Sequence, residues 1–255
     1  MNGFTAFVRK EATEILRTWR ILVLPGILLF FAITGPVMAR FTPEILKAVA
    51  DMPAAAIKAL IPDPTYLDSY GQWAKNLSQI GLFALIIVYG GIVSSERKSG
   101  TAVLVLTKPV SRSAFIAAKA LVHAAFLTVI VTAGTLVTWG GTALTFGSAP
   151  VAPLLDSAFS WLVFALLFLS LMTLLSVALP SQAGAAGVGI GVYALLAIAG
   201  LSKTLTLYTP VGLSSAPSVL ASGKHFALLW PVLSSVALSV ALVAAAAWLF
   251  SRQEL

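Results

Sequence analysis

Six segments of this chain are each apolar over the roughly 20 residues that a helix needs to cross the hydrocarbon core of a bilayer. In hydrocarbon, every backbone N–H and C=O group must be hydrogen-bonded within the protein, so such segments are expected to be helical. The sequence therefore predicts an all-α integral membrane protein that forms a single transmembrane domain over residues 1–255. The expected transmembrane helices are Ile21–Ala39, Leu77–Ser94, Phe115–Leu136, Leu154–Leu179, Ala183–Leu201 and Phe226–Phe250.

The composition agrees with a protein whose solvent includes the lipid bilayer. Hydrophobic residues make up 59% of the chain and charged residues only 10%, with a mean hydropathy of +0.98, whereas soluble domains carry about 25% charged residues. The net charge of +7 does not indicate nucleic acid as a partner, because the basic residues lie between the apolar segments. The absence of Cys excludes disulfides and thiolate metal sites, and we expect neither a metal site nor catalytic residues.

The distribution of Lys and Arg orients the six helices, because these residues collect in short cytoplasmic loops. With both termini inside, ten of the 16 basic residues fall on the cytoplasmic side and six on the other. We therefore expect a multi-pass protein of the cytoplasmic (inner) membrane with both termini in the cytoplasm. The ten are Arg9, Lys10, Arg17, Arg20, Arg97, Lys98, Lys108, Arg112, Lys119 and Arg252, and the six are Arg40, Lys47, Lys58, Lys75, Lys203 and Lys224.

Residues 1–20 are expected to form an interfacial helix before the first span. Apolar residues recur at helical spacing from Phe4 to Trp19, while Arg9, Lys10 and Arg17 take other faces. A basic amphipathic helix that leads into a span is expected to lie in the cytoplasmic membrane interface. A plain cytoplasmic extension of the first span is the alternative.

Residues 40–76 form a long external stretch between the first two spans. Apolar residues around Ile45 and Ile57 fit two short amphipathic helices on the outer surface, with aromatic side chains at headgroup depth. The stretch suits a substrate gate, a docking site for an external partner protein, or a lid over the helix ends. Four prolines indicate that no single helix runs through it. These are Pro43, Pro53, Pro62 and Pro64, and the aromatic residues are Tyr66, Tyr70 and Trp73.

The loop over residues 95–113 carries the most information about function. A charged run ends the second span, Gly100 permits a sharp turn, and Ala102–Thr107 is expected to form a short helix parallel to the membrane. Pro109 stops that helix, and Ser111 can cap the next span. A helix held in the cytoplasmic surface by charged ends is suited to transmit force from a soluble partner. A basic loop with no partner is the alternative.

The pattern Glu96-x-x-x-Gly100-Thr101, followed by Pro109-x-x-Arg112-x-x-Phe115-x-x-x-Lys119, resembles permease subunits of ABC transporters of the type-2 exporter class. Those proteins have six helices, an N-terminal elbow helix often containing an Arg-Lys-Glu run, and a cytoplasmic coupling helix in this loop. The long external stretch is similar to that of the copper-enzyme maturation and gliding-motility permeases. The resemblance implies an ATPase-coupling framework of Glu96, Arg97, Lys98, Gly100, Thr101, Pro109, Arg112 and Lys119, and an interfacial elbow with Arg9, Lys10, Glu11 and Arg17.

The sequence contains no G-x-x-x-x-G-K-[ST] phosphate loop, so we expect no ATP hydrolysis by this chain on its own. The resemblance implies a separate ATPase subunit that binds ATP and Mg, with no cofactor on this chain. Six helices rarely enclose a pathway alone, so a homodimer or a second permease subunit is expected. Gly187 and Gly191 are a candidate helix-packing seam, within the chain or between two chains. The cargo is an apolar or amphiphilic substrate, whose binding residues are unknown, or force exerted on an external protein.

An ATP-independent secondary transporter or channel is the alternative function. Ion-coupled carriers place Asp, Glu or His within the membrane, whereas Glu96 and Asp156 lie at the ends of expected spans and only His123 lies inside one. Intramembrane proteolysis is disfavoured. Residues 212–216 lack the second glycine of a serine-protease elbow, and the two His residues are too few for a zinc site.

Overall fold

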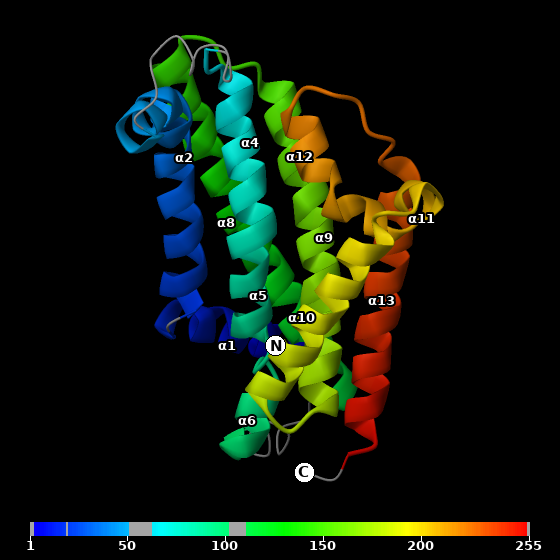
Figure 1. Cartoon of the computed structure of the whole chain (residues 1–255). Coiled ribbons are helices and arrows are strands. Elements are labelled where there is room, and N and C mark those ends of the chain that lie inside the picture. Colours follow the sequence, from blue (N-terminus) through cyan, green and yellow to red (C-terminus); the bar gives the residue numbers. More distant parts are fainter. Residues whose placement is uncertain (1–2, 19, 51–62, 102–110, 254–255) are drawn as a thin grey trace.

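The computed structural model describes residues 3–18, 20–50, 63–101 and 111–253, and every regular element within those ranges is a helix. Figure 1 shows the long helices side by side, with both ends of the chain at the same end of the bundle. The helices are α1 (Gly3–Arg17), α2 (Arg20–Ala50), α4 (Tyr66–Asn76), the π-helical turn η1 (Leu77–Gly81), α5 (Leu82–Tyr89), α6 (Ser94–Lys98), α8 (Arg112–Phe146), α9 (Val151–Ala178), α10 (Gln182–Ala199), α11 (Lys203–Tyr208), the 3₁₀ turn η2 (Pro210–Ser214), α12 (Ala216–Ala221) and α13 (Leu229–Ser251).

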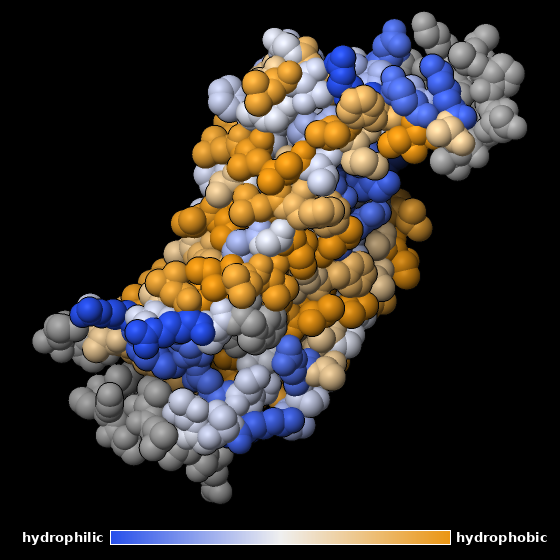
Figure 2. All heavy atoms as spheres, turned by 90° about the vertical axis from the view of Figure 1, so that its left-hand side faces the viewer, coloured by the Kyte–Doolittle hydropathy of each residue, from blue (hydrophilic) through white to orange (hydrophobic). Residues whose placement is uncertain are grey.

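The prediction of six transmembrane helices is confirmed. Six helical stretches of the described chain are long and apolar enough to cross a membrane: Ile21–Ala48, Tyr66–Lys98, Arg112–Phe146, Val151–Ala178, Gln182–Ala199 and Leu229–Ser251. In Figure 2, apolar side chains cover the middle of the face on the α2 side, and hydrophilic side chains gather at its two ends. This distribution is the one that a bilayer flanked by water selects.

The first span is longer than the sequence predicts. Helix α2 contains Pro25, Pro36 and Pro43 and continues to Ala50, so the residues around Ile45, which were expected to form a separate surface helix, belong to it. Residues 63–65 are not helical, so no single helix runs through 40–76, as predicted. Membrane helices tolerate Pro where neighbouring helices and hydroxyl side chains replace the lost backbone bonds. A Thr hydroxyl lies close to each of the last two prolines: Thr34 donates to the Phe30 carbonyl at 2.8 Å and Thr42 to the Met38 carbonyl at 2.7 Å.

The second span begins at Tyr66 rather than Leu77. Tyr70 and Trp73 are fully buried in the bundle instead of facing the headgroups. The reason is a gap in α8, where a Cβ atom added to Gly134 would lie 2.7 Å from the Trp73 ring. The helix expected around Ile57, like the coupling helix Ala102–Thr107 and Pro109, lies outside the described residues.

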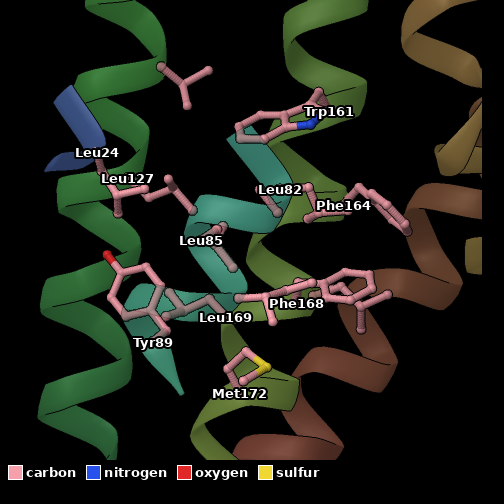
Figure 3. Packing of buried hydrophobic residues seen from close by; sticks show 14 of the residues in the cluster. Leu24, Leu82, Leu85, Tyr89, Leu127, Trp161, Phe164, Phe168, Leu169 and Met172 are labelled. Carbon is pink, nitrogen blue, oxygen red and sulfur yellow. The ribbon is translucent and has the colours of Figure 1, made fainter. Parts of the chain in front are cut away.

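Helix α9 lies at the centre of the bundle and packs against α8, α13, α12, α5 and α10. It is apolar around its whole circumference, as a helix surrounded by others must be. Figure 3 shows the core that it organises. The side chains shown there come from α2 (Leu24), α5 (Leu82, Leu85 and Tyr89), α8 (Leu127) and α9 (Trp161, Phe164, Phe168, Leu169 and Met172), and all belong to one buried cluster.

Candidate functional site

Five charged side chains form a cluster at the end of the bundle where both termini lie; three of them are buried, and Lys10 and Glu14 are partly exposed. We call Lys10, Glu11, Glu14, Glu96 and Lys119 the ion cluster. The Lys119 ammonium donates to Glu11 Oε2 at 2.9 Å and to Glu96 Oε1 at 2.7 Å. Lys10 lies 2.8 Å from Glu11 Oε1, 2.6 Å from Glu14 Oε2 and 3.2 Å from Glu96 Oε1. The ion cluster therefore joins α1, α6 and α8, which are far apart in the sequence.

Helix α1 runs crosswise at the lower end of α2, as Figure 1 shows, and its sequence explains which side faces the long helices. Phe7, Glu11 and Ile15 recur every four residues and are all buried, whereas the positions between them are mostly exposed. The Phe7 ring packs on Phe115 of α8, with centroids 5.1 Å apart, and Phe115 stacks on Phe250 of α13 at 5.2 Å. This apolar packing places Glu11 next to the side chain of Lys119, which lies one turn after Phe115 on α8.

The positive and negative charges of the ion cluster are nearly balanced. Three carboxylates and two ammonium groups leave a formal charge of −1, with Lys119 fully buried and the Glu11 side chain 1% exposed. A charge in such a place is tolerated only when paired and hydrogen-bonded. Glu11, Glu14 and Glu96 lie close enough together to ligate a cation, but the two ammonium groups already occupy the space between these carboxylates.

Neighbouring carboxylates keep the Lys10 side chain protonated. Burial by itself lowers the pKa of this ammonium group, but hydrogen bonds to Glu11 and Glu14 and attraction to Glu96 outweigh it, so the pKa lies above its ordinary value. A cation with a raised pKa contributes its full stabilisation below the unfolded-state pKa and loses it only as the pH rises through the folded-state pKa. Lys10 therefore stays protonated throughout the neutral range.

Both ends of the loop over 95–113 are fastened to neighbouring helices. Arg97 donates to the Val177 carbonyl at the end of α9, at 2.9 Å. Arg112 donates to the carbonyls of Ser251 and Gln253 beyond α13. Gly100 has a φ of +73°, which only glycine adopts without strain. The predicted cap is confirmed: Ser111 Oγ accepts a hydrogen bond from the Ala114 amide at 3.2 Å.

The structure brings together some residues of the predicted coupling framework and elbow, and separates others. Glu96 and Lys119 of the framework meet Lys10 and Glu11 of the elbow, and Glu14, which the sequence prediction missed, joins them. The exposed residues Arg9, Arg17 and Lys98 lie on other faces, and within the described part of the chain Thr101 bonds the Ser99 hydroxyl at 2.7 Å. One signal for the cluster was available: Lys119 lies inside a span, where a charge requires a partner.

Two further features singled out in the sequence are His123 and the glycine pair of α10. His123, one turn beyond Lys119, is buried with its ring edge-to-face against Tyr89 at 5.1 Å between centroids. Gly187 and Gly191 are exposed, and a Cβ atom added to either would meet no described atom within 4 Å. Close packing of α10 on the rest of the chain uses Gly189 instead, which lies against Met172 and Ile86. A seam at Gly187 and Gly191 stays a prediction, now for contacts with another chain.

The six apolar spans define a multi-pass α-helical membrane protein, and the ion cluster lies near the end of the bundle that holds the termini. The model of the family described as ABC-2 family transporter protein matches residues 5–255. The chain belongs to this family, and it is therefore an ABC-transporter membrane protein of the permease type. Such proteins are typically non-catalytic membrane subunits, and membership implies a partner ATPase subunit.

The chain is also similar to a protein described as uncharacterized transmembrane protein YxlG, from Bacillus subtilis (strain 168). The two are 23% identical over 123 residues, which is 48% of this chain and 47% of the relative. The chain thus aligns with about half the length of this curated relative. The resemblance to the copper-enzyme maturation and gliding-motility branch stays a prediction.

Proposed function

We propose that this chain is the permease subunit of an ATP-driven exporter, in which a separate ATPase subunit binds ATP and Mg. Hydrolysis on that subunit would drive export of an apolar or amphiphilic substrate, or exert force on an external partner protein. The observation that carries this proposal is the ion cluster. It connects α6, where the loop over 95–113 begins, with α1 and with the third span through hydrogen bonds of 2.7 to 3.2 Å.

The cluster gives a physical route from the loop to the spans. A push on the loop displaces α6 and with it Glu96, whose Oε1 is shared by Lys10 and Lys119. Separating these charges in a buried site is costly, so α1 and α8 follow the loop as one unit. The helices then alternate between two packed arrangements, which is how small displacements become switches.

The proposal places the chain in the cytoplasmic (inner) membrane with both termini in the cytoplasm. The distribution of basic residues supports this orientation. A homodimer or a second permease subunit would complete the pathway, and the exposed pair Gly187 and Gly191 on α10 supports a seam there. An external partner is proposed to dock at residues 40–76, of which 40–50 and 63–76 are described.

The alternative is an ATP-independent secondary transporter or channel. One observation favours it: Lys119 is a fully buried cation within a span and is paired with two carboxylates. Ion-coupled carriers use such groups. The position of the cluster at the very end of the bundle, against α1, favours a mechanical role over an ion path.

The deciding experiment purifies the tagged chain from its host in mild detergent and identifies what accompanies it. A stoichiometric ATPase subunit with a phosphate loop supports the proposal, whereas a chain that purifies alone and transports without ATP supports the alternative. Two charge reversals then test the coupling role: Glu96→Lys or Arg112→Glu is expected to weaken ATPase attachment or transport-linked ATP turnover while leaving the spans folded. Lys224→Glu, at an exposed position outside the predicted coupling framework, is the control. Normal attachment and turnover in both variants would remove the loop from the mechanism.

A further inference from the structure

A groove of about 540 Å³ runs along the outside of the bundle between α8, α9 and α13. Nearly all of its lining is hydrocarbon, and its polar side chains are three serines. Small residues on two helices create the hollow, because Ala leaves space that Leu or Phe would fill. The residues that define it are Ala117, Ala120 and Ala124 of α8, Leu169 of α9, and Ala244 and Ala247 of α13.

The groove has the length of one lipid leaflet. Its lining on α8 extends from Ser113 to Ala124, which at 1.5 Å per residue is about 16 Å. The lining on α13 extends from Ser239 to Ala247, or about 12 Å. Half of a typical hydrocarbon core is about 15 Å. The groove starts at the end of the bundle that holds the termini and ends near mid-membrane, so it matches a single acyl chain.

One guanidinium group lies at the end of the groove. Arg112 immediately precedes Ser113, and its Nη1 bonds the carbonyls of Ser251 and Gln253, so it bridges the ends of α8 and α13. Arg252 lies over the Trp248 ring, on a face of α13 that does not line the groove. Basic pockets between spans on the cytoplasmic side bind anionic lipid headgroups.

We propose that this groove is a binding site for one anionic phospholipid of the leaflet on the side of the chain termini. One acyl chain fills the groove, and the phosphate is bound by the guanidinium group of Arg112. The bound chain packs α8, which carries Lys119, against α13. The site does not depend on the proposed transport function, because it follows from the shape and charge of this face alone.

Native mass spectrometry of the purified chain tests the site. The chain, depleted of lipid in detergent, is mixed with phosphatidylglycerol and phosphatidylethanolamine of identical acyl composition. One retained phosphatidylglycerol is expected, with a clear preference over phosphatidylethanolamine. Ala244→Phe fills the groove and is expected to abolish retention, whereas Ala245→Phe, at an exposed neighbouring position that does not line the groove, retains the lipid as the wild type does.

A second pair of variants separates the acyl-chain site from the headgroup site. Ala117→Leu, from α8, is expected to repeat the loss seen with Ala244→Phe, and thermal unfolding verifies that both variants are folded. Arg112→Gln is expected to lower the phosphatidylglycerol preference by about fivefold, the effect of one basic residue near an anionic surface. Wild-type retention in either folded groove variant, or an equal affinity of the wild type for the two lipids, would overturn the proposal.

Discussion

The two ends of the helical bundle use their charged residues differently. At the end with the termini, Lys119 draws together Glu11 and Glu96, residues that are 108 and 23 positions away in sequence. At the opposite end, among the described residues, Asp68 accepts hydrogen bonds from the backbone and hydroxyl of Thr65, and Arg40 donates to the Thr145 carbonyl. The helices there are joined by neutral hydrogen bonds, such as that between the buried hydroxyls of Ser69 and Thr142 at 2.7 Å. One end is held together by buried charges, and the other by neutral hydrogen bonds and local caps.

This difference indicates which end of the bundle can transmit motion between helices. A buried charge network is costly to break partway, so helices joined by one move together or not at all. Exposed caps contribute little beyond their own helix, and a neutral hydrogen bond between helices costs less to break than a buried charge network. The end with the ion cluster is therefore suited to receive force, and the opposite end is suited to open. Substitutions at the two ends should differ in size and in how far their effects extend.

The largest effect is expected for Lys119→Met. Removing this ammonium leaves Glu11 and Glu96 buried with too few partners, which costs about 3–5 kcal/mol of folding free energy. Unfolding in detergent, followed by circular dichroism, measures the loss. Lys98→Met removes an exposed charge nearby and is expected to stay within about 0.5 kcal/mol of the wild type.

A variant with compensating substitutions tests whether the lost stability comes from unpaired charge. The triple variant Lys119→Met, Glu11→Gln, Glu96→Gln removes both stranded carboxylates and is expected to recover most of the stability, because a neutral packed site avoids the desolvation cost. It should not recover ATPase-linked turnover. A triple variant as unstable as Lys119→Met alone would mean that packing, rather than charge, dominates at this end of the bundle.

The next largest effect is expected where α4 crosses α8. Gly134→Ala places a methyl group 2.7 Å from the buried Trp73 ring and should cost about 1–3 kcal/mol through overpacking. Gly140→Ala, on the same helix with no atom within 4 Å, should instead stabilise by up to about 1 kcal/mol through helix propensity. Thermal unfolding of the two variants gives the comparison. Equal shifts in the unfolding temperature would show that α4 and α8 separate easily where Trp73 meets Gly134.

The sequence predicts the spans well because length and hydropathy alone set them. Helix α10 begins and ends within two residues of the predicted Ala183–Leu201. The prediction ends the first span too early: α2 continues past Ala39, through Pro43, to Ala50, because membrane helices tolerate Pro. It also fails for Trp73, whose burial depends on Gly134, a residue 61 positions later.

The ion cluster could be predicted only in part. Glu96, Lys119, Lys10 and Glu11 follow from the resemblance, and the place of Lys119 inside a span requires that it have a partner. Which partner it takes depends on the crosswise path of α1, which the packing of Phe7 on Phe115 determines. That contact joins residues 108 positions apart, and no local pattern encodes it. Tertiary packing therefore decides the pairing.

A smaller effect is expected for Arg112→Gln, which tests how firmly the third span holds the end of α13. The substitution removes the bonds from the guanidinium to the carbonyls of Ser251 and Gln253 at a partly exposed site. The expected loss is about 1 kcal/mol, the usual net contribution of such bonds. Hydrogen exchange should quicken in the last turn of α13 and stay unchanged in α9. Faster exchange in α1 as well would show that the ion cluster depends on this anchor.

The smallest effect is expected at the opposite end, for Asp68→Ala. Its carboxylate accepts from the Thr65 amide at 2.7 Å and from the Thr65 hydroxyl at 3.0 Å, both exposed. Losing this cap should cost about 0.5–1 kcal/mol and fray only the first turn of α4. Hydrogen exchange over residues 65–69, compared with that over α8 in the same sample, measures how far the effect extends. If exchange also rose in α8, the caps at this end would connect helices as the ion cluster does, and the mechanical contrast between the two ends would disappear.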